Sequence, residues 1–185
     1  MTQSKLKFDY SNAKVWADVT DYVSTLSGFA RTHQMDLTSL LNTTAWQGAE
    51  ADLGATIAAQ YGIWAAVEMA AAAAATSLET FSYYWVPLTG ASLGFNNNIV
   101  TGGGSYSGTT ADSLEDSLAQ FNHIKDFPLT TDVTPIVQFK YLGIVSGAKL
   151  TQYGAPIVYN KCASADHHSD AAECFFAMVP VIDET

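Results

Sequence analysis

Positive charge is scarce in this sequence. Its 185 residues include 8 lysines and arginines against 18 acidic residues, which gives a formal net charge of −10. Only one of the bases, Arg31, is an arginine. Proteins bind nucleic acids by neutralising phosphates with lysine and arginine, and no basic patch is visible here. The composition therefore argues against a nucleic-acid partner, and the acidity favours solubility more than it identifies any other partner.

Long apolar runs are also missing. Residues 1–16 lack the apolar centre of a secretory signal. The longest stretch of low charge, residues 61–75, contains Glu68 and is mostly alanine, which is too weakly apolar to span a bilayer. We therefore expect no targeting segment and no membrane partner.

Cysteine is equally sparse, with only Cys162 and Cys174 in the chain. We expect two reduced, partly buried thiols. A disulfide that closes the polar loop between them is geometrically possible, but their spacing alone does not decide it.

Apolar residues, by contrast, are plentiful. They make up 48% of the chain and charged residues only 14%, which argues against intrinsic disorder. The length is sufficient for one domain with a core. Residues 61–69 alternate apolar side chains on one face with Trp64, Ala66 and Glu68 on the other, as a half-buried strand requires. Further strands are predicted at residues 80–88, 120–131, 133–145, 155–161 and 173–184.

The alanine run at residues 70–75 is harder to interpret. Alanine has the highest helix propensity, which by itself favours a helix over residues 65–75. The run has no charged residue to solvate one side of a helix, and no strong cap precedes it. We therefore predict an alanine-rich connection between two strands, with the helix as the alternative.

Other segments complete a β-rich prediction. Leu114, Leu118 and Phe121 have the spacing of one short amphipathic helix, or of an extended segment with apolar anchors. Residues 89–110 form a long Gly/Asn/Ser-rich loop, and such loops are often functional or interfacial. Several short strands separated by turns predict a β-sandwich or barrel. Residues 1–45 are predicted to be an irregular arm or a few short strands, and residues 46–185 a single β domain.

The loop at residues 164–174 is the one ligand-like cluster in the sequence. Its nitrogen, oxygen and sulfur donors are Asp166, His167, His168, Asp170, Glu173 and Cys174. Adjacent histidines on a strand point to opposite faces, and the spacing matches no established zinc pattern. We therefore interpret the loop as a solvated turn and expect no metal and no cofactor.

The sequence contains no enzyme signature above background. It has no G-x-S-x-G motif, and the glycine-rich "GGGSYSG" lacks the lysine of a phosphate-binding loop. His33 and His123 are isolated, and we interpret both as structural. Asp112, Glu115 and Asp116 suit the first turn of a helix. An aromatic strip that could bind sugar rings or a protein would comprise Tyr83, Tyr84, Trp85 and Tyr106, although core packing is the first interpretation of Tyr83 and Trp85.

Several segments between residues 45 and 185 carry a family resemblance. They include "WQGAEADLGAT", "FSYYWVPL", "SLAQFNHIKDFPLTT", "QYGAPIVYNKCASADHHSD" and the closing "MVPVIDE". Together they resemble small virion proteins of tailed bacteriophages that are encoded near the major capsid protein. The corresponding family motifs fall at residues 51–56, 84–87, 153–160, 169–170 and 180–184. One departure is Gln152, where the family pattern has a basic residue.

This resemblance implies a head decoration or cement protein without catalytic residues. Such proteins are often jelly-roll-like antiparallel β-sandwiches that form homotrimers and bind the major capsid protein. The chain would be made in the host cytoplasm and reside on the capsid surface of the virion. We expect the N-terminal arm to contact the capsid, with Phe8, Tyr10 and Trp16 as anchors.

Two other functions remain open from the sequence. The first is a phage tail or fibre protein that binds a cell-surface glycan through the aromatic strip and the loop at residues 89–110. The second is a metal- or carboxylate-dependent hydrolase that uses residues 166–173. We expect the decoration role rather than an enzyme.

Overall fold

The structure is a computed structural model of the chain. It describes residues 5–23, 28–38, 40–70, 79–88, 103–108, 113–129, 137–163, 166–169 and 172–184. The expected connection at residues 71–75, and most of the loop at residues 89–110, lie outside these described residues.

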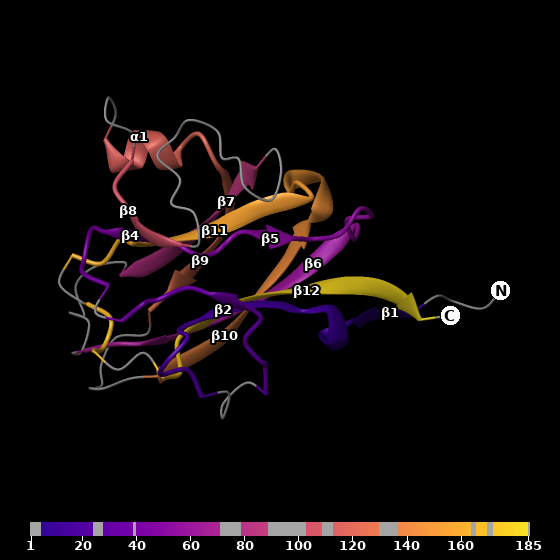
Figure 1. The fold of residues 1–185 in the computed structure, drawn as a ribbon, viewed down its shortest axis with the longest axis horizontal. Coiled ribbons are helices and arrows are strands. Elements are labelled where there is room, and N and C mark those ends of the chain that lie inside the picture. Colours follow the sequence, from indigo (N-terminus) through magenta and orange to yellow (C-terminus); the bar gives the residue numbers. More distant parts are fainter. Residues whose placement is uncertain are drawn as a thin grey trace.

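Two sheets pack face to face (Figure 1). Sheet A has the order β10 (Val137–Ser146), β6 (Gln60–Glu68), β12 (Phe175–Glu184), β2 (Lys14–Ala17) and β3 (His33–Gln34), and β1 (Lys5–Phe8) pairs with the far end of β12. Sheet B has the order β8 (Gly104–Tyr106), β4 (Ala45–Gln47), β11 (Tyr153–Asn160), β7 (Thr80–Leu88) and β9 (Asn122–Pro128), and β5 (Ala51–Asp52) pairs with β11. Neighbouring strands are antiparallel except β2 and β3. The predicted β-sandwich is confirmed, and the jelly-roll strand order stays a prediction.

The alternation in residues 61–69 produces β6. Tyr61, Ile63 and Val67 point into the core between the sheets, whereas Trp64 and Ala66 point to the outer face of sheet A. On one side β6 pairs with β12 and on the other with β10. The strand prediction for this segment is therefore confirmed.

Large aromatic side chains fill the space between the sheets. The Trp16 ring lies 6.0 Å from Trp85 and 5.7 Å from Phe176, and the Tyr83 ring stacks on Phe176 at 4.8 Å. Gly154 on β11 makes room for Trp85, because a Cβ at this position would lie 2.2 Å from the indole. Burial of aromatic residues of this size dominates the stability of such a core.

The first 45 residues contribute strands to both sheets. β1 and β2 run along β12 in sheet A, and β4 begins at Ala45 in sheet B. Between β1 and β2 lies the 3₁₀ turn η1 (Tyr10–Asn12), held by hydrogen bonds from Ser11 and Asn12 to the Asp9 carboxylate. Of the two predictions for this region, the few short strands match the described residues better than an irregular arm.

Helix is a minor component of the described residues. The α-helix α1 (Leu114–Leu118) is capped at its N-terminus by Ser113, whose hydroxyl accepts a hydrogen bond from the Asp116 amide. The second 3₁₀ turn is η2 (Gly147–Lys149). The predicted short helix is confirmed for Leu114 and Leu118, but it ends before Phe121, which packs on sheet B beside it. No helix among the described residues is long and apolar enough to cross a membrane.

Candidate binding surfaces

The outer face of sheet A carries a cluster of aromatic rings centred on Trp64. Phe8 and Tyr141 each lie 4.7 Å from the Trp64 ring, and Tyr10 and Phe29 each lie 5.9 Å from it. An antiparallel sheet usually covers one face with apolar residues and leaves the other polar. Here both faces of sheet A are apolar.

Gly62 explains how the indole of Trp64 fits on this face. A Cβ at Gly62 would lie 2.4 Å from the Trp64 ring and 2.6 Å from Phe8. Without that atom, the indole lies against the backbone of β6 and the edge of Phe8 packs on it. A close approach of this kind is a common reason for glycine within a strand.

Part of the cluster is open to solvent. The exposed fractions are 57% for Tyr10, 44% for Phe139, 48% for Tyr141 and 42% for Ile144. We call these four residues the β10 patch, because three of them lie on the outer side of β10. Phe139, Tyr141 and Ile144 share one side because a bulge after Tyr141 shifts the register by one residue. Tyr10 joins them through Phe8 and Trp64.

The three expected capsid anchors lie in three different environments. Tyr10 is exposed, Phe8 is half-buried in the aromatic cluster, and Trp16 is completely buried. The indole N–H of Trp16 donates to the carbonyl of Ala49 at 2.8 Å. Alternation along β2 turns Trp16 inward, while its neighbour Val15 faces outward. Trp16 is therefore a core residue, which corrects the expectation that it is an exposed anchor.

The predicted aromatic strip does not form one exposed surface. Tyr83 and Trp85 are completely buried in the core, as their first interpretation held. Tyr84 faces the outer side of sheet B and is 8% exposed. Tyr106 is buried on that same side beneath Phe121, with the rings 5.9 Å apart.

A small cleft on the outer face of sheet B has mixed chemistry. It measures about 310 Å³ and is lined by Tyr84, Tyr159, Glu115 and Lys161, with apolar atoms of α1 beside them. The Tyr159 hydroxyl donates to Glu115 Oε1 at 3.1 Å. Burial, together with the Glu115 carboxylate, raises the pKa of Tyr159. The Lys161 ammonium lies 6.0 Å from the Tyr84 ring and 5.9 Å from the Tyr159 ring.

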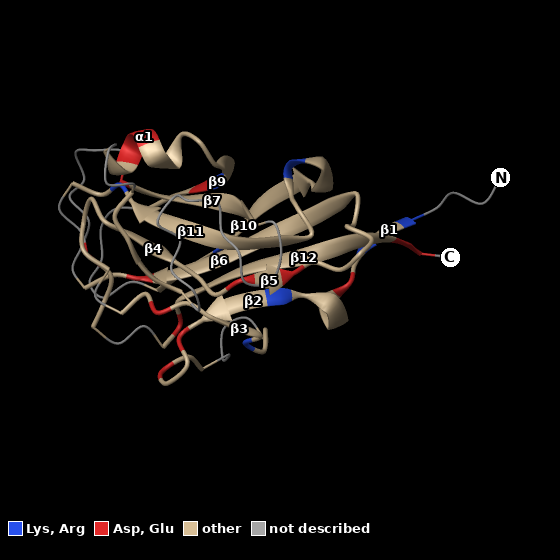
Figure 2. Cartoon of the chain, turned by 45° about the horizontal axis from the view of Figure 1, so that its top comes forward, with Lys and Arg blue, Asp and Glu red and all other residues tan. Residues whose placement is uncertain are grey.

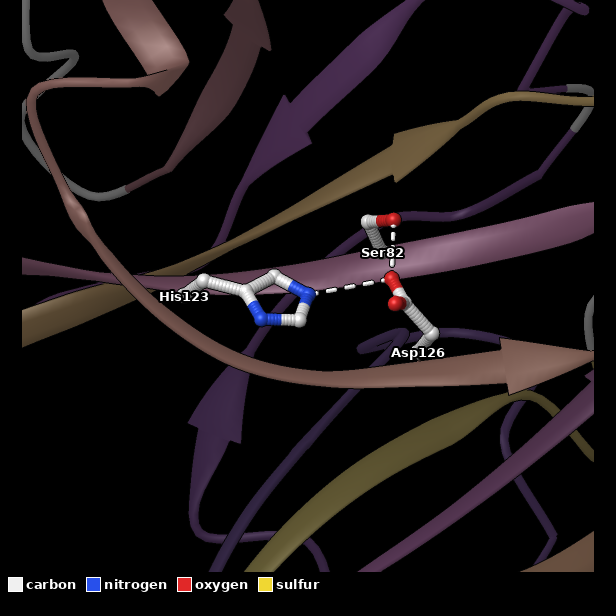
Figure 3. Close-up of polar contacts among 3 residues, drawn as sticks. All are labelled: Ser82, His123 and Asp126. Atoms are coloured by element: carbon white, nitrogen blue, oxygen red, sulfur yellow. Dashed lines mark hydrogen bonds and ion pairs between the residues drawn. The ribbon is translucent and has the colours of Figure 1, made fainter.

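Next to this cleft, β7 and β9 bring a serine, an aspartate and a histidine together (Figure 3). The Ser82 hydroxyl contacts Asp126 Oδ1 at 2.5 Å, and His123 Nε2 lies 3.0 Å from the same oxygen. A catalytic triad needs the histidine between the serine and the acid, so that imidazole can take the serine proton. Here the aspartate is in the middle, so the arrangement holds β7 to β9 and does not activate Ser82.

His123 is therefore not isolated, contrary to the expectation from the sequence. Residues three apart on a regular strand point to opposite faces. A register shift between Tyr83 and Tyr84 places a bulge in β9, and this brings His123 and Asp126 to the same side. Partial burial acts to raise the pKa of Asp126, but hydrogen bonds from Ser82 and His123 outweigh it and leave the pKa below its usual value.

The loop at residues 164–174 separates its potential ligands. His167 is buried, with Nδ1 3.4 Å from Cys174 Sγ, while His168 turns outward to within 4.0 Å of Glu68. The Asp166 carboxylate accepts a hydrogen bond from the Asn42 amide at 2.6 Å. Among the described residues, which do not include Asp170, no three potential ligands lie close enough together to hold a metal ion.

Both cysteines are buried thiols, and the structure shows no disulfide between them across this loop. Burial, assisted by the nearby Glu79, raises the pKa of Cys162 and keeps it protonated. Such a thiol is a poor nucleophile. His33 also has a structural setting, because it stacks on Trp16 at 5.1 Å and burial lowers its pKa to about 4.

No family model, no curated protein and no solved structure matches this chain significantly. We therefore infer function from the residues and the geometry of the molecule itself.

Proposed function

We propose that the protein is a capsid decoration protein of a tailed bacteriophage, which binds the outer surface of the major capsid protein and stabilises the head. The observation that carries the proposal is the β10 patch, an uncharged aromatic surface on an otherwise acidic molecule. Exposed apolar groups of this kind typically mark protein-binding sites. The resemblance to small virion proteins supplies the class of partner.

The physical role would be mechanical. Packaged DNA pushes outward on a thin shell. A protein that binds only the assembled, expanded lattice stabilises that lattice by mass action. Tyrosine and phenylalanine bury large areas with few rotatable bonds, so a small patch can supply much of the binding free energy. The net negative charge would keep unbound copies apart.

The test is co-sedimentation of the purified protein with expanded shells assembled from the major capsid protein of the parent phage. We expect saturable binding at a copy number comparable with that of the capsid protein. The double variant Phe139→Ser/Tyr141→Ser should lose at least tenfold in affinity. A matched control is Leu41→Ser, because Leu41 is 55% exposed outside the patch. Equal binding by all three proteins would contradict the proposed surface, and no binding by any would contradict the proposed function.

The cleft on sheet B favours a second candidate, a tail or fibre protein that binds a cell-surface glycan. Its two tyrosines, one carboxylate and one ammonium are groups that hydrogen-bond to sugar hydroxyls. A glycan array probed with the wild type and with Glu115→Gln tests this function. Signals that disappear in Glu115→Gln, together with only a few copies per particle, would favour the glycan role over decoration.

A further inference from the structure

A cleft of about 610 Å³ lies at one end of the sandwich, between β2, β6 and β12 of sheet A and β5 of sheet B. Its volume falls within the range of about 300–1,000 Å³ that is typical of small-ligand sites. It shares no residue with the β10 patch or with the cleft beside α1. We call it the end cleft, and its lining includes Asp9, Lys14, Asp52, Leu53, Tyr61 and Ile182.

Part of the lining of the end cleft is apolar. Leu53 and Pro180 line it, together with Ile182, which is 36% exposed. Ile182 lies on the same side of β12 as Pro180, because side chains two apart on a strand share a face. Burial of exposed apolar area is favourable, so an apolar group of a ligand would bind against Ile182.

Charges of both signs line the rest of the end cleft. Asp9 and Asp52 supply carboxylates, and Lys14 supplies an ammonium. None of these three forms an ion pair within 4.0 Å in the part of the chain that the structure describes. Figure 2 shows acidic and basic positions near one another where β2 and β5 lie. The end cleft therefore holds opposite charges that do not neutralise each other.

Hydrogen bonds within the chain hold both carboxylates in place. The Asp9 carboxylate accepts a hydrogen bond from Asn12 Nδ2 at 2.7 Å. Asp52 Oδ1 accepts one from the Gly54 amide at 2.7 Å and one from Gln152 Nε2 at 3.2 Å. Asp52 Oδ2 accepts none from a described residue. A fixed carboxylate oxygen is thus available to a donor on a ligand.

Tyr61 adds a buried donor to the end cleft. Its side chain is only 2% exposed, and its hydroxyl accepts a hydrogen bond at 3.2 Å from the amide of Ala58, which also lines the cleft. The hydroxyl proton has no acceptor among the described residues. An acceptor on a ligand would complete the hydrogen bonds of this buried group. Tyr61 and Lys14 thus offer donors, whereas the two carboxylates offer acceptors.

We propose that the end cleft binds a small zwitterion with an apolar side chain, either a free α-amino acid or a dipeptide. The ammonium of the ligand binds the two carboxylates, its carboxylate binds Lys14 and Tyr61, and its side chain covers Ile182. A cation alone would leave Lys14 unpaired, and an anion alone would be repelled by the two carboxylates. A neutral sugar would lack the stronger hydrogen bonds that form between two charged groups. Binding of this ligand is independent of the proposed capsid contact, so it can be tested on the isolated protein.

The first experiment varies the ligand. L-leucine and leucyl-leucine are titrated into the wild type and followed by the amide chemical shifts of the protein in NMR spectra. We expect at least one of them to shift the signals of the end cleft saturably, with a Kd of about 1 mM or lower. Leucinamide lacks the carboxylate and 4-methylpentanoate lacks the ammonium, and each should bind about tenfold more weakly or worse. The tighter of the two zwitterions shows whether the site takes a free amino acid or a dipeptide.

The second experiment varies the protein. Asp52→Asn keeps the Oδ1 acceptor that holds the turn but removes the charge, and Lys14→Met keeps the apolar stem but removes the ammonium. Each should weaken binding of the zwitterion about tenfold. Asp52→Asn should bind 4-methylpentanoate, which has no ammonium, at least as tightly as the wild type does. Lys14→Met should do the same with leucinamide, which has no carboxylate. Asp126→Asn and Lys125→Met are matched controls outside the end cleft and should leave all affinities unchanged.

Three results would overturn the proposal. The first is the lack of a saturable shift with leucine and leucyl-leucine up to about 10 mM. The second is binding of glucose, leucinamide or 4-methylpentanoate as tightly as the better zwitterion. The third is an equal affinity of the wild type, Asp52→Asn and Lys14→Met for that zwitterion.

Discussion

The two outer faces of the sandwich differ in how far the rest of the chain covers their apolar residues. Sheet B has apolar residues on its outer side, and the chain covers them itself with Leu118 of α1 and with Phe121. On sheet A, Phe29 and Tyr22 cover only the part of the outer face near Phe175 and Trp64. The side formed by β10 remains open. The chain thus covers the outer apolar face of sheet B itself, whereas sheet A leaves apolar surface exposed that a partner could cover.

β10 also shows how that partner would bind. Long edge strands tend to pair with other chains, and natural proteins block them with bulges and inward-facing charges. β10 has both devices, a bulge at Gly143 with φ of 101° and the inward-facing Lys140. The Lys140 ammonium contacts the Pro128 carbonyl and lies 4.9 Å from the Phe127 ring, and burial lowers its pKa. A partner would therefore contact the face of β10 and not its edge.

The largest expected effect distinguishes the covered part of the sheet A face from its open part. Trp64→Ala removes the ring at the centre of the aromatic cluster, and we expect it to lower the free energy of unfolding by about 3–5 kcal/mol. Tyr141→Ala, at the 48% exposed rim, should cost about 1 kcal/mol. Urea unfolding followed by tryptophan fluorescence and circular dichroism measures both. Equal losses would mean that the rim is as essential to the fold as the centre.

The next prediction concerns a substitution that exposes the apolar outer face of sheet B. Leu118 is 1% exposed between α1 and sheet B, and Leu118→Ala should cost about 2–3 kcal/mol, at the lower end for a buried leucine because α1 is short. The variant should also bind a hydrophobic dye more strongly than the wild type. Leu114→Ala is the matched control, because Leu114 is only partly buried in the same helix. An unchanged Leu118→Ala protein would show that α1 does not cover this face.

Much of this fold could be predicted from period-two alternation. The two side-chain sets of residues 61–69 lie on opposite faces of β6, but both faces are buried, so the strand is not half-buried as expected. The strand predicted at residues 173–184 is β12. Alternation alone does not place Trp16 in the core, because Val15, Trp16 and Ala17 are all apolar and Lys14 lies on the same side of β2 as Trp16. Aromatic content alone does not indicate exposure, because a large ring is equally suited to a core.

Bulges and long-range pairing could not be predicted in this way. His123 meets Asp126 only because β9 has one extra residue opposite β7. The β10 patch depends on a similar bulge and on the approach of Tyr10 from a distant part of the chain. A short stretch of sequence shows neither where a bulge forms nor which distant segment packs beside it. The pairing of β1 with the last four residues of β12 likewise joins segments far apart in the sequence.

The next prediction is that buried His167 makes the free energy of unfolding depend on pH. Burial lowers the pKa of His167 from 6.5 to about 3, so this histidine is neutral in the fold and takes up a proton on unfolding. Its contribution to stability is complete above pH 6.5 and is lost as pH falls toward about 3. The free energy of unfolding should fall by about 1 kcal/mol per pH unit in that window. His167→Gln should reduce this slope, and its neighbour His168→Gln should not; identical slopes would place the acid sensitivity elsewhere.

The smallest expected effect belongs to the polar contact on the outer face of sheet B. Asp126 is half-exposed, so Asp126→Asn should lower the free energy of unfolding at pH 7 by less than about 1 kcal/mol. The folded state lowers the pKa of Asp126 below 3.8, so its ionised form contributes stability above that pH and loses the contribution as pH falls through the lowered value. Urea unfolding should therefore show a wild-type advantage at pH 7 that shrinks as the pH falls below 3.8. Because the contact lies away from the β10 patch, Asp126→Asn should bind capsid shells as the wild type does. A loss of shell binding in this variant would move the capsid-facing surface from the outer face of sheet A to that of sheet B.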